Sequence, residues 1–256
     1  MTRALLGLLT RIRLPGLQVN LEAAAKQQYL FPLVGLLVGL IAALICISLD
    51  LAFGDGDPLI LGGLLLVALY AVTGIIHTEG LADLADGVMA SGPREKRREV
   101  MKDPRAGVAA VIAVAVYLLL FFALAVEMCA RAGESVTILP IPWHVPFALG
   151  FVVSEVSGKL AMNTSMLIGP SAHQGMGSVF VENATARRFA VAVVLAGVVG
   201  LMTVGLASIL LLVGVAGGAA VTIVARKHLG GVSGDVFGAA NEVGRLSALL
   251  LWVLII

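Results

Sequence analysis

Long apolar runs without charges alternate with short polar segments along this chain of 256 residues. A helix needs about 20 apolar residues to cross a bilayer, and most of the runs have about this length. The stretch 189–225 is too long for one span and predicts a tight hairpin of two. A last helix is expected to begin among residues 235–245 and to continue through the final apolar residues. The remaining runs cover residues 29–53, 59–77, 106–128 and about 146–168.

This pattern predicts an all-α fold, a polytopic integral membrane bundle of about seven transmembrane helices, formed as a single domain over residues 1–256. Composition supports the membrane assignment, because 59% of the residues are apolar and only 13% are charged, whereas soluble domains carry about 25% charged residues. Residues 1–28 lack the layout of a signal peptide and are expected to remain as a cytoplasmic or interfacial segment. Gly35 and Gly39 form a G-x-x-x-G pair, which predicts close helix packing in the first span.

The positions of Lys and Arg indicate how the bundle is oriented. Fourteen of the 17 basic residues fall in four segments that alternating spans would place on the same side of the membrane. The positive-inside rule makes this side cytoplasmic. We therefore expect a multi-pass protein of the cytoplasmic membrane whose active site faces the cytoplasm. The four segments are residues 1–28, 78–105, 169–188 and 226–242.

Three carboxylates stand out in the stretch 78–105, which we expect to form a cytoplasmic catalytic loop. If this stretch is helical, the spacings of four and seven residues place Glu79, Asp83 and Asp86 within about 60° of one face. Carboxylate oxygens suit Mg²⁺, above all when substrate phosphates complete its coordination. The alternative is a solvated acidic helix end that is balanced by the basic run after it.

A second acidic set follows the glycine-rich segment 230–234. Asp235 and Glu242 are again seven residues apart, and Asn241 lies directly before Glu242. Such a pair could complete a metal site or act as a general base, while the preceding glycines could offer backbone N–H groups to a phosphate. A plain N-cap is the alternative interpretation of Asp235.

The segment 101–107, MKDPRAG, comes directly before the third predicted span. Asp103 followed by Pro104 predicts the N-cap and the first residue of that helix. Lys102 and Arg105 flank the same helix start, where they and the helix dipole would favour a bound phosphate. The basic run at 94–98 is sufficiently explained by anionic lipid headgroups, so we expect it mainly to set the topology.

Polar residues also occur inside the fourth predicted span. Glu155, Lys159 and Asn163 are spaced by four residues and form one stripe along a helix. Charges at membrane depth normally face the bundle interior or a wet cavity. An internal ion pair and the wall of a substrate cavity are both open as interpretations.

Motifs for several other chemistries are missing from the chain. It has no Walker loop, no G-x-G-x-x-G turn, no nucleophile elbow and no linear zinc motif. His77 borders the acidic face and His173 lies in a predicted cytoplasmic loop, so either could meet a substrate. The residues alone therefore indicate phosphoryl or nucleotidyl transfer at a membrane face, with a divalent cation.

These residues resemble those of the cobalamin synthase family, the adenosylcobinamide-GDP ribazoletransferases (CobS family). The resemblance covers almost the whole chain, and its most specific parts are HTEGLADLADG at 77–87 and GGVSGDVFGAANE at 230–242. Family members usually carry Asp at the position of Glu79, and commonly MKDSRIG in place of MKDPRAG. Further matching parts are Leu9–Arg11, FPLVGLLVG at 31–39 and Gly175–Gly177.

The resemblance implies an enzyme that joins adenosylcobinamide-GDP with α-ribazole or its 5′-phosphate, a late step of cobalamin biosynthesis. A ribazole hydroxyl would attack the phosphate that stays on the cobinamide, and GMP would leave. It further implies a requirement for Mg²⁺. The expected partners are the two substrates and the lipid bilayer, with no nucleic acid, and a homo-oligomer is left open.

The site residues that follow from this resemblance form three sets. Substrate and phosphate binding is expected from Lys102, Asp103, Arg105 and Asn241. The metal is expected to be held by Glu79, Asp83 and Asp86. Catalysis is expected from Asp83, Asp86, Asp235 and Glu242, the last two completing a metal site or accepting the proton.

Two other functions are compatible with parts of the pattern. A CDP-alcohol phosphotransferase-like enzyme also works at a membrane face, and Asp83 to Gly87 fits its D-x-x-D-G start, but Ala90 is followed by Ser91 where that motif has Arg. A transporter could use Glu155, Lys159 and Asn163 to line a path. It would be supported by broken spans in matching positions of two halves, which the sequence does not show.

Overall fold

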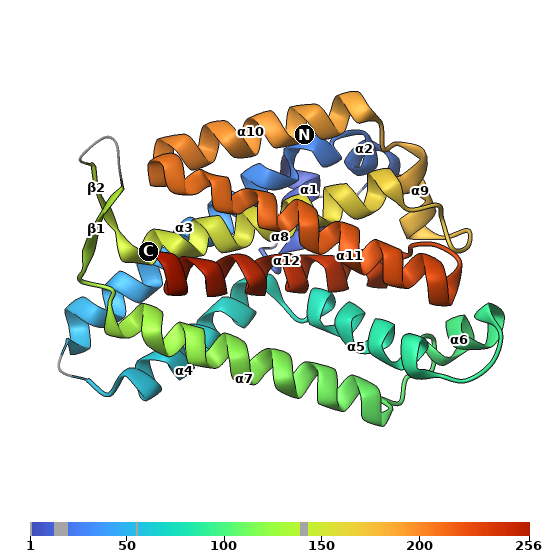
Figure 1. The fold of residues 1–256 in the computed structure, drawn as a ribbon, viewed down its shortest axis with the longest axis horizontal. Coiled ribbons are helices and arrows are strands. Elements are labelled where there is room, and N and C mark those ends of the chain that lie inside the picture. Colours follow the sequence, from blue (N-terminus) through green and yellow to red (C-terminus); the bar gives the residue numbers. More distant parts are fainter. Residues whose placement is uncertain (1, 13–19, 55, 139–142) are drawn as a thin grey trace.

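Helix α8 (Gly150–Ile168) forms the centre of a bundle of helices in the computed structural model, which describes residues 2–12, 20–54, 56–138 and 143–256. Helices α3, α11 and α12 all pack against it (Figure 1). Every residue from Gly150 to Met166 is buried, although this helix is more polar than its neighbours. Its charged side chains therefore face protein rather than lipid.

The first long helix, α3 (Phe31–Phe53), follows a short 3₁₀ turn at Gln28–Leu30 and lies along α8. A Cβ atom on Gly35 would lie 2.7 Å from the carbonyl oxygen of Glu155, and one on Gly39 would lie 2.6 Å from Cα of Val152. Only glycine fits at such a distance between backbones. The close packing predicted from the G-x-x-x-G pair is confirmed.

The second predicted span is a broken one. Helix α4 (Pro58–Thr73) ends at Gly74, whose positive φ of 71° favours glycine, and α5 (Ile76–Met89) continues at an angle of 92° to it. The predicted catalytic loop 78–105 is therefore largely helical. It consists of most of α5 and of α6 (Arg94–Val100), which are joined by a short turn.

Helix α7 (Val108–Ala130) packs against α4 and α5. The one sheet seen among the described residues follows it in the chain. Strands β1 (Ser135–Ile138) and β2 (Trp143–Pro146) pair antiparallel, with Ser135 opposite Pro146. A 3₁₀ turn at Phe147–Leu149 then leads into α8.

The predicted hairpin of two apolar spans is confirmed. Helix α10 (Ala186–Val204) runs to one end of the molecule, the chain turns through the 3₁₀ segment η3 (Gly205–Leu211), and α11 (Leu212–Leu229) runs back (Figure 1). Gly205 has a positive φ of 57° at this turn. The other helices are α1 (Thr2–Leu9), α2 (Leu21–Lys26), α9 (Met176–Glu182) and α12 (Gly234–Ile255).

By length and apolarity, four helical stretches of the described chain could cross a membrane, or five if α4 and α5 form one broken span. One of the four is the stretch Ala186–Leu229, which doubles back on itself. The protein is thus an all-α, multi-pass membrane protein. The number of about seven spans remains a prediction.

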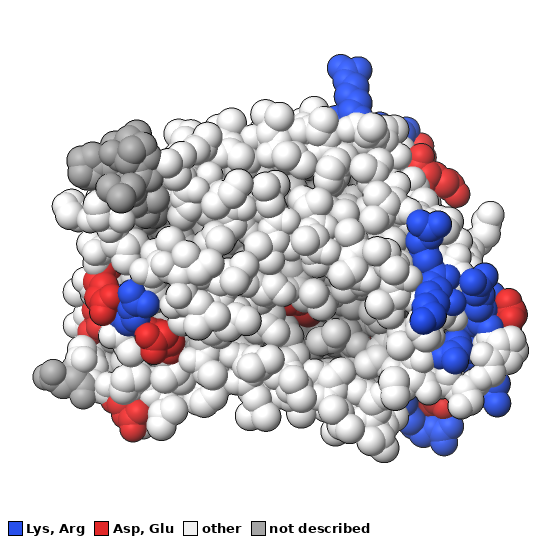
Figure 2. Space-filling model, viewed as in Figure 1, with Lys and Arg blue, Asp and Glu red and all other residues white. Residues whose placement is uncertain are grey.

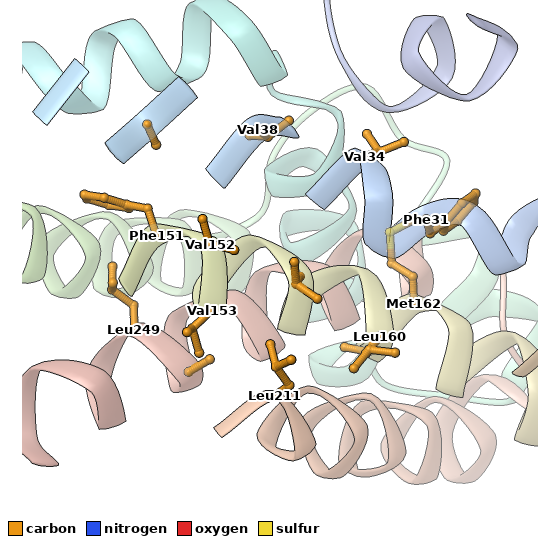
Figure 3. Close-up of a cluster of buried hydrophobic side chains, with 14 of the residues drawn as sticks. Phe31, Val34, Val38, Phe151, Val152, Val153, Leu160, Met162, Leu211 and Leu249 are labelled. Atoms are coloured by element: carbon orange, nitrogen blue, oxygen red, sulfur yellow. The ribbon is translucent and has the colours of Figure 1, made fainter. Parts of the chain in front are cut away.

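Apolar side chains of α3, α8 and α12 interlock along the middle of the bundle (Figure 3). Val34 and Val38 of α3 face Val152 and neighbouring residues of α8, and Leu249 of α12 lies on another side. Lipid tails are as apolar as leucine, so close packing rather than removal from water favours this arrangement. Basic side chains gather at the end of the molecule that carries α6 (Figure 2).

Candidate active site

The two acidic segments of the sequence meet where α5 crosses α12. A Cβ atom on Gly80 would lie 3.0 Å from Cα of Asp235, and one on Gly238 would lie 3.1 Å from Cα of His77. These glycines let the two backbones touch, as small residues do in membrane helix pairs. The two acidic segments therefore lie side by side at this crossing, and that they form one site stays a prediction.

Asp83 and Asp235 are the partly buried carboxylates at this crossing. Asp83 lies one turn after Gly80, on the same face of α5. It is partly buried, and its negatively charged neighbours are Asp235, Glu79 and Asp86. Like charges at short range repel, so a cation or a proton would be favoured between them.

Asp235 is not the N-cap of α12. Ser233 occupies that position, and Asp235 lies in the first helical turn, where its Oδ2 accepts a hydrogen bond of 3.2 Å from Oγ of Ser233. The N-cap interpretation of Asp235 is thus wrong. Its carboxylate instead lines two cavities at the helix start.

Asp86 has a structural partner that the sequence did not indicate. Its Oδ2 accepts a hydrogen bond of 2.6 Å from the amide of Gly107, and its Oδ1 accepts one of 2.9 Å from the amide of Ala110. Asp86 therefore caps α7 from a different helix, since the first amides of a helix lack intrahelical acceptors. A Cβ on Gly107 would lie 2.6 Å from Asp86 Oδ1, so the glycine of MKDPRAG makes room for the carboxylate.

The loop before α9 is tied to the segment before α12. The amide of Val232 donates to the carbonyl of Pro170 at 2.8 Å, and the amide of Ala172 donates back to the carbonyl of Val232 at 2.9 Å. Gly231 is needed here, because a Cβ would lie 2.7 Å from the nitrogen of Ala172. This pairing holds His173 beside Asp235.

A polar cavity of about 100 Å³ opens next to Asp235. Arg98, Lys102 and His173 bring three nitrogen-bearing side chains to its walls, and Arg98 also donates to the carbonyl of Leu229 at 2.8 Å. Cationic donors around a small polar cavity suit phosphate oxygens. The full lining is Arg98, Met101, Lys102, Ala172, His173, Leu229, Ser233 and Asp235.

Arg105 and Asp103 lie outside this cavity. Arg105 Nη2 lies 2.8 Å from Asp103 Oδ2, and the arginine side chain is 87% exposed. Hydrogen bonds from Arg105 lower the pKa of Asp103 to about 2. Asp103 is not the N-cap of α7 either, because Gly107 occupies that position and the helix starts at Val108. The predicted cap was wrong because the capping carboxylate comes from Asp86.

Glu242 and Asn241 lie about two turns deeper along α12, in a buried polar network. Arg245 bridges two carboxylates, with its Nη1 3.2 Å from Oε2 of Glu242 and its Nε 2.8 Å from Oε1 of Glu155. Asn241 accepts a hydrogen bond of 2.6 Å from Nζ of Lys159. The hydroxyl of Tyr117 donates to Glu242. Neither residue lines the cavities around Asp235.

The polar stripe of α8 therefore makes internal contacts. Glu155 pairs with Arg245 rather than with Lys159, and Asn163 donates to the carbonyl of Gln28 at 3.0 Å. Glu155 and Lys159 thus contact α12, and Asn163 contacts the 3₁₀ turn before α3. This favours the internal-pair interpretation over the wall of a substrate path.

Among the described residues, no group of three or more His, Cys, Asp and Glu side chains lies close enough together to hold a metal ion. Glu79, Asp83 and Asp86 share one helix face, but they are spread over about 10 Å of helical rise. Mg²⁺ is commonly held by one or two carboxylates together with waters and substrate phosphates. Asp83 and Asp235, beside a phosphate-sized polar cavity, fit that manner of binding.

Sequence reasoning missed Arg98, and it named His173 only as a loop residue that could meet a substrate. Arg98 was hidden in a basic run that suits anionic lipid, yet its spacing of four residues from Lys102 could have linked the two. No local signal showed that His173 lines the same cavity as Asp235. Its position depends on the backbone pairing between residues 170–172 and Val232, which joins segments about 60 residues apart.

Comparison with known proteins adds independent information. The family model of cobalamin-5-phosphate synthases (CobS) matches residues 1–253. A protein of Halorubrum lacusprofundi named adenosylcobinamide-GDP ribazoletransferase is 36% identical, over 96% of this chain and 94% of its own length. A protein of the same name from Methanocella arvoryzae is 34% identical, over 98% of this chain and 96% of its own length. Another from Thermococcus kodakarensis is 32% identical, over 99% of this chain and 98% of its own length. No solved structure matches. The chain thus belongs to the cobalamin-5-phosphate synthase family.

Proposed function

We propose that this protein joins adenosylcobinamide-GDP to α-ribazole or its 5′-phosphate, and releases GMP. The names of the related proteins supply the reaction. The observation that carries the assignment is the position of Asp235, which lines a cavity with Arg98, Lys102 and His173 and whose backbone packs against Gly80, one turn before Asp83. Transfer of a substituted phosphate needs cationic binding groups and an acceptor for a proton at the same place.

The polar cavity would bind the diphosphate of the GDP-activated substrate. Lys102 and Arg98 supply positive charge on one wall, and His173 faces them from the loop before α9. Charge-assisted hydrogen bonds to phosphate oxygens hold the group in place and stabilise the charge that develops on the leaving phosphate. Arg105 is turned away and paired, so it contributes little.

Asp235 is suited to accept the proton of the attacking hydroxyl. The ribazole hydroxyl oxygen forms a bond to the phosphorus that carries the cobinamide, the bond between this phosphorus and the GMP oxygen breaks, and the hydroxyl proton passes to the carboxylate. Asp83 would hold Mg²⁺ together with Asp235 and the substrate phosphates. The ion would supply charge neutralisation on the phosphate oxygens.

Other predicted residues take supporting positions in this proposal. Asp86 holds the start of α7 against α5, and Glu79 is exposed at the edge of the acidic face. Glu242 and Asn241 stabilise α12 from inside the bundle. We place the site on the cytoplasmic side of the membrane, because Lys and Arg gather at this end of the molecule (Figure 2).

The direct test is an assay of the protein in detergent with adenosylcobinamide-GDP, α-ribazole and Mg²⁺, in which cobalamin and GMP are both measured. We expect both products in equal amounts. Asp235→Asn should lower kcat by about 10³-fold or more, since it removes the proton acceptor and a charge beside the phosphates. Asp50→Asn, the same change in α3 and outside both cavities, is the matched control.

Two results would contradict the proposal. One is turnover of a CDP-activated alcohol in place of adenosylcobinamide-GDP, which would indicate a CDP-alcohol phosphotransferase. The other is ion-coupled uptake of a substrate into proteoliposomes without release of GMP, which would indicate a transporter. A normal rate in Asp235→Asn would contradict the role of that residue alone.

A further inference from the structure

A second cavity, which we call the inner cavity, is also lined by Asp235 and has a volume of about 140 Å³. It is lined by the starts of α5, α9 and α12, the last turns of α8, and residues of α1, α2 and α3. Apart from His77 and Asp235, its described lining residues are apolar or glycine. Asp235 also lines the polar cavity, so the two cavities share this one carboxylate.

The walls of this inner cavity are rich in aromatic and sulfur-containing side chains. Phe31 and Phe180 form a tilted pair with ring centroids 6.0 Å apart, and Phe237, Met162 and Met166 complete the lining around them. Such side chains bind flat aromatic groups through ring stacking and sulfur contacts. One water molecule needs about 10–15 Å³ of such a volume. The cavity, at about 140 Å³, therefore has room for about ten heavy atoms, which is the size of a bicyclic ring.

We propose that the inner cavity binds the aromatic base of the acceptor nucleoside. This proposal rests on the proposed function, in which the acceptor is α-ribazole, the α-riboside of a dimethylated benzimidazole. The base would lie among Phe31, Phe180 and Phe237, and the ribose would point outward past Asp235. The attacking hydroxyl would then lie between this carboxylate and the phosphates in the polar cavity.

The polar lining favours a nucleoside over a lipid tail as the occupant. Asp235 and His77 form part of the cavity wall, and an acyl chain would leave both without a polar partner in an apolar surrounding. A nucleoside offers ring nitrogens and ribose hydroxyl groups to the same two side chains. A binding site that is mostly apolar with a few converging polar groups is typical of small-molecule sites.

The experiment uses the full chain in detergent and two variants that change the cavity in opposite directions. Met166→Phe makes it smaller and Phe180→Leu makes it larger. Met89→Phe is the matched control, because Met89 is 72% exposed on α5 and lies outside the cavity. Binding of α-ribazole is measured by its change in fluorescence without the second substrate. The kinetic comparison uses α-ribazole against the α-riboside of unsubstituted benzimidazole, which is smaller by two methyl groups.

We expect Met166→Phe to raise the Kd and KM for α-ribazole about tenfold and to shift kcat/KM toward the smaller base by a similar factor, since each buried methyl group contributes several-fold. Phe180→Leu should weaken the binding of both nucleosides to a similar extent. The KM for adenosylcobinamide-GDP should stay within about twofold in both variants, as should all constants in Met89→Phe. A general loss of folding would move these constants together and would not change the preference between bases.

The possible failures can be told apart. If the wild type makes cobalamin but the preference between bases is the same in all variants, the cavity does not hold the base and the proposed function stands. Displacement of bound phospholipid by Met166→Phe, with unchanged constants for α-ribazole, would likewise overturn the proposal in favour of a lipid tail. If α-ribazole binds and the variants change its Kd, but no cobalamin forms, the cavity assignment stands and the proposed reaction fails.

Discussion

Asp235 and Glu242 lie on the same helix, seven residues apart, but their surroundings are opposite. Asp235 is partly buried and lines two cavities. Glu242 is 2% exposed and is satisfied by Arg245 and Tyr117. The first carboxylate is available to a substrate, whereas the second is used by the protein itself. A shared helix face therefore does not imply a shared role.

The buried network around Arg245 is a closed set of charges. Its guanidinium lies between Glu155 and Glu242 and stacks over the ring of Phe121 at 4.4 Å from the centroid. Charges in an apolar bundle are costly unless each is paired and hydrogen-bonded. The cavity at the α6 end is more open: Lys102 and His173 are exposed residues of its lining, and the partner of Arg98 there is the exposed Glu95, 3.1 Å away. Changes at the two places should thus affect different properties.

The largest effect is expected from breaking the closed network. Arg245→Met would remove the direct ion-pair partner of the buried Glu155 and Glu242, which should destabilise the protein by about 3–5 kcal/mol. Thermal unfolding in detergent, followed by the fraction of monodisperse protein, measures this loss. Adding Glu155→Gln and Glu242→Gln to Arg245→Met should restore most of the stability. A single variant as stable as the wild type would mean that the network is not a structural unit.

A smaller effect, on substrate binding alone, is expected at the open cavity. Lys102→Ala should raise the KM for adenosylcobinamide-GDP about 10- to 100-fold, because it removes a charge-assisted hydrogen bond to phosphate. Its unfolding temperature should be unchanged. The comparison is Arg105→Ala, three residues along the chain, which removes an exposed arginine paired with Asp103. The KM of Arg105→Ala should change less than twofold. Equal effects in the two variants would mean that Arg105 also binds the substrate.

The smallest effect is expected where the acidic face meets α7. Gly107→Ala would push Asp86 away from the amides of residues 107 and 110 and should cost about 1–2 kcal/mol of stability. Hydrogen exchange at these two amides should become faster. Gly197→Ala is the control, because nothing lies within 4 Å of its added Cβ and alanine favours a helix. Unchanged exchange in Gly107→Ala would show that Asp86 is free for another role.

Much of the fold could be predicted from apolar periodicity. The first span, the hairpin after residue 189 and the contact at Gly35 and Gly39 all agree with the structure. The break between α4 and α5 could not be predicted, because residues 59–77 read as one continuous apolar run. The backbone leaves the helix at Gly74, a single residue whose positive φ leaves no mark on the hydropathy pattern.

The site was predicted less completely, for a geometric reason. Periodicity gives the angle of a side chain around its helix but says nothing about which neighbour it meets along the axis. The sequence predicts one site from Asp83, Asp86 and Asp235, and the structure uses Asp86 to cap α7. Glu242 shares the face of Asp235 and lies about 10 Å further along the helix. Contacts between distant segments, such as those that place His173, have no local signature.

The crossing of α5 and α12 at Gly80 and Gly238 also bears on the bilayer itself. Membranes differ in thickness, and helices respond by tilting or shifting along the membrane normal. Here helices α5 and α12, which hold the site residues, touch through their main chains, so we expect the two helices to move together. The separation between Asp83 and Asp235 is then set by backbone dimensions rather than by lipid composition. The same reaction centre could therefore be kept unchanged in organisms whose membranes are built from quite different lipids.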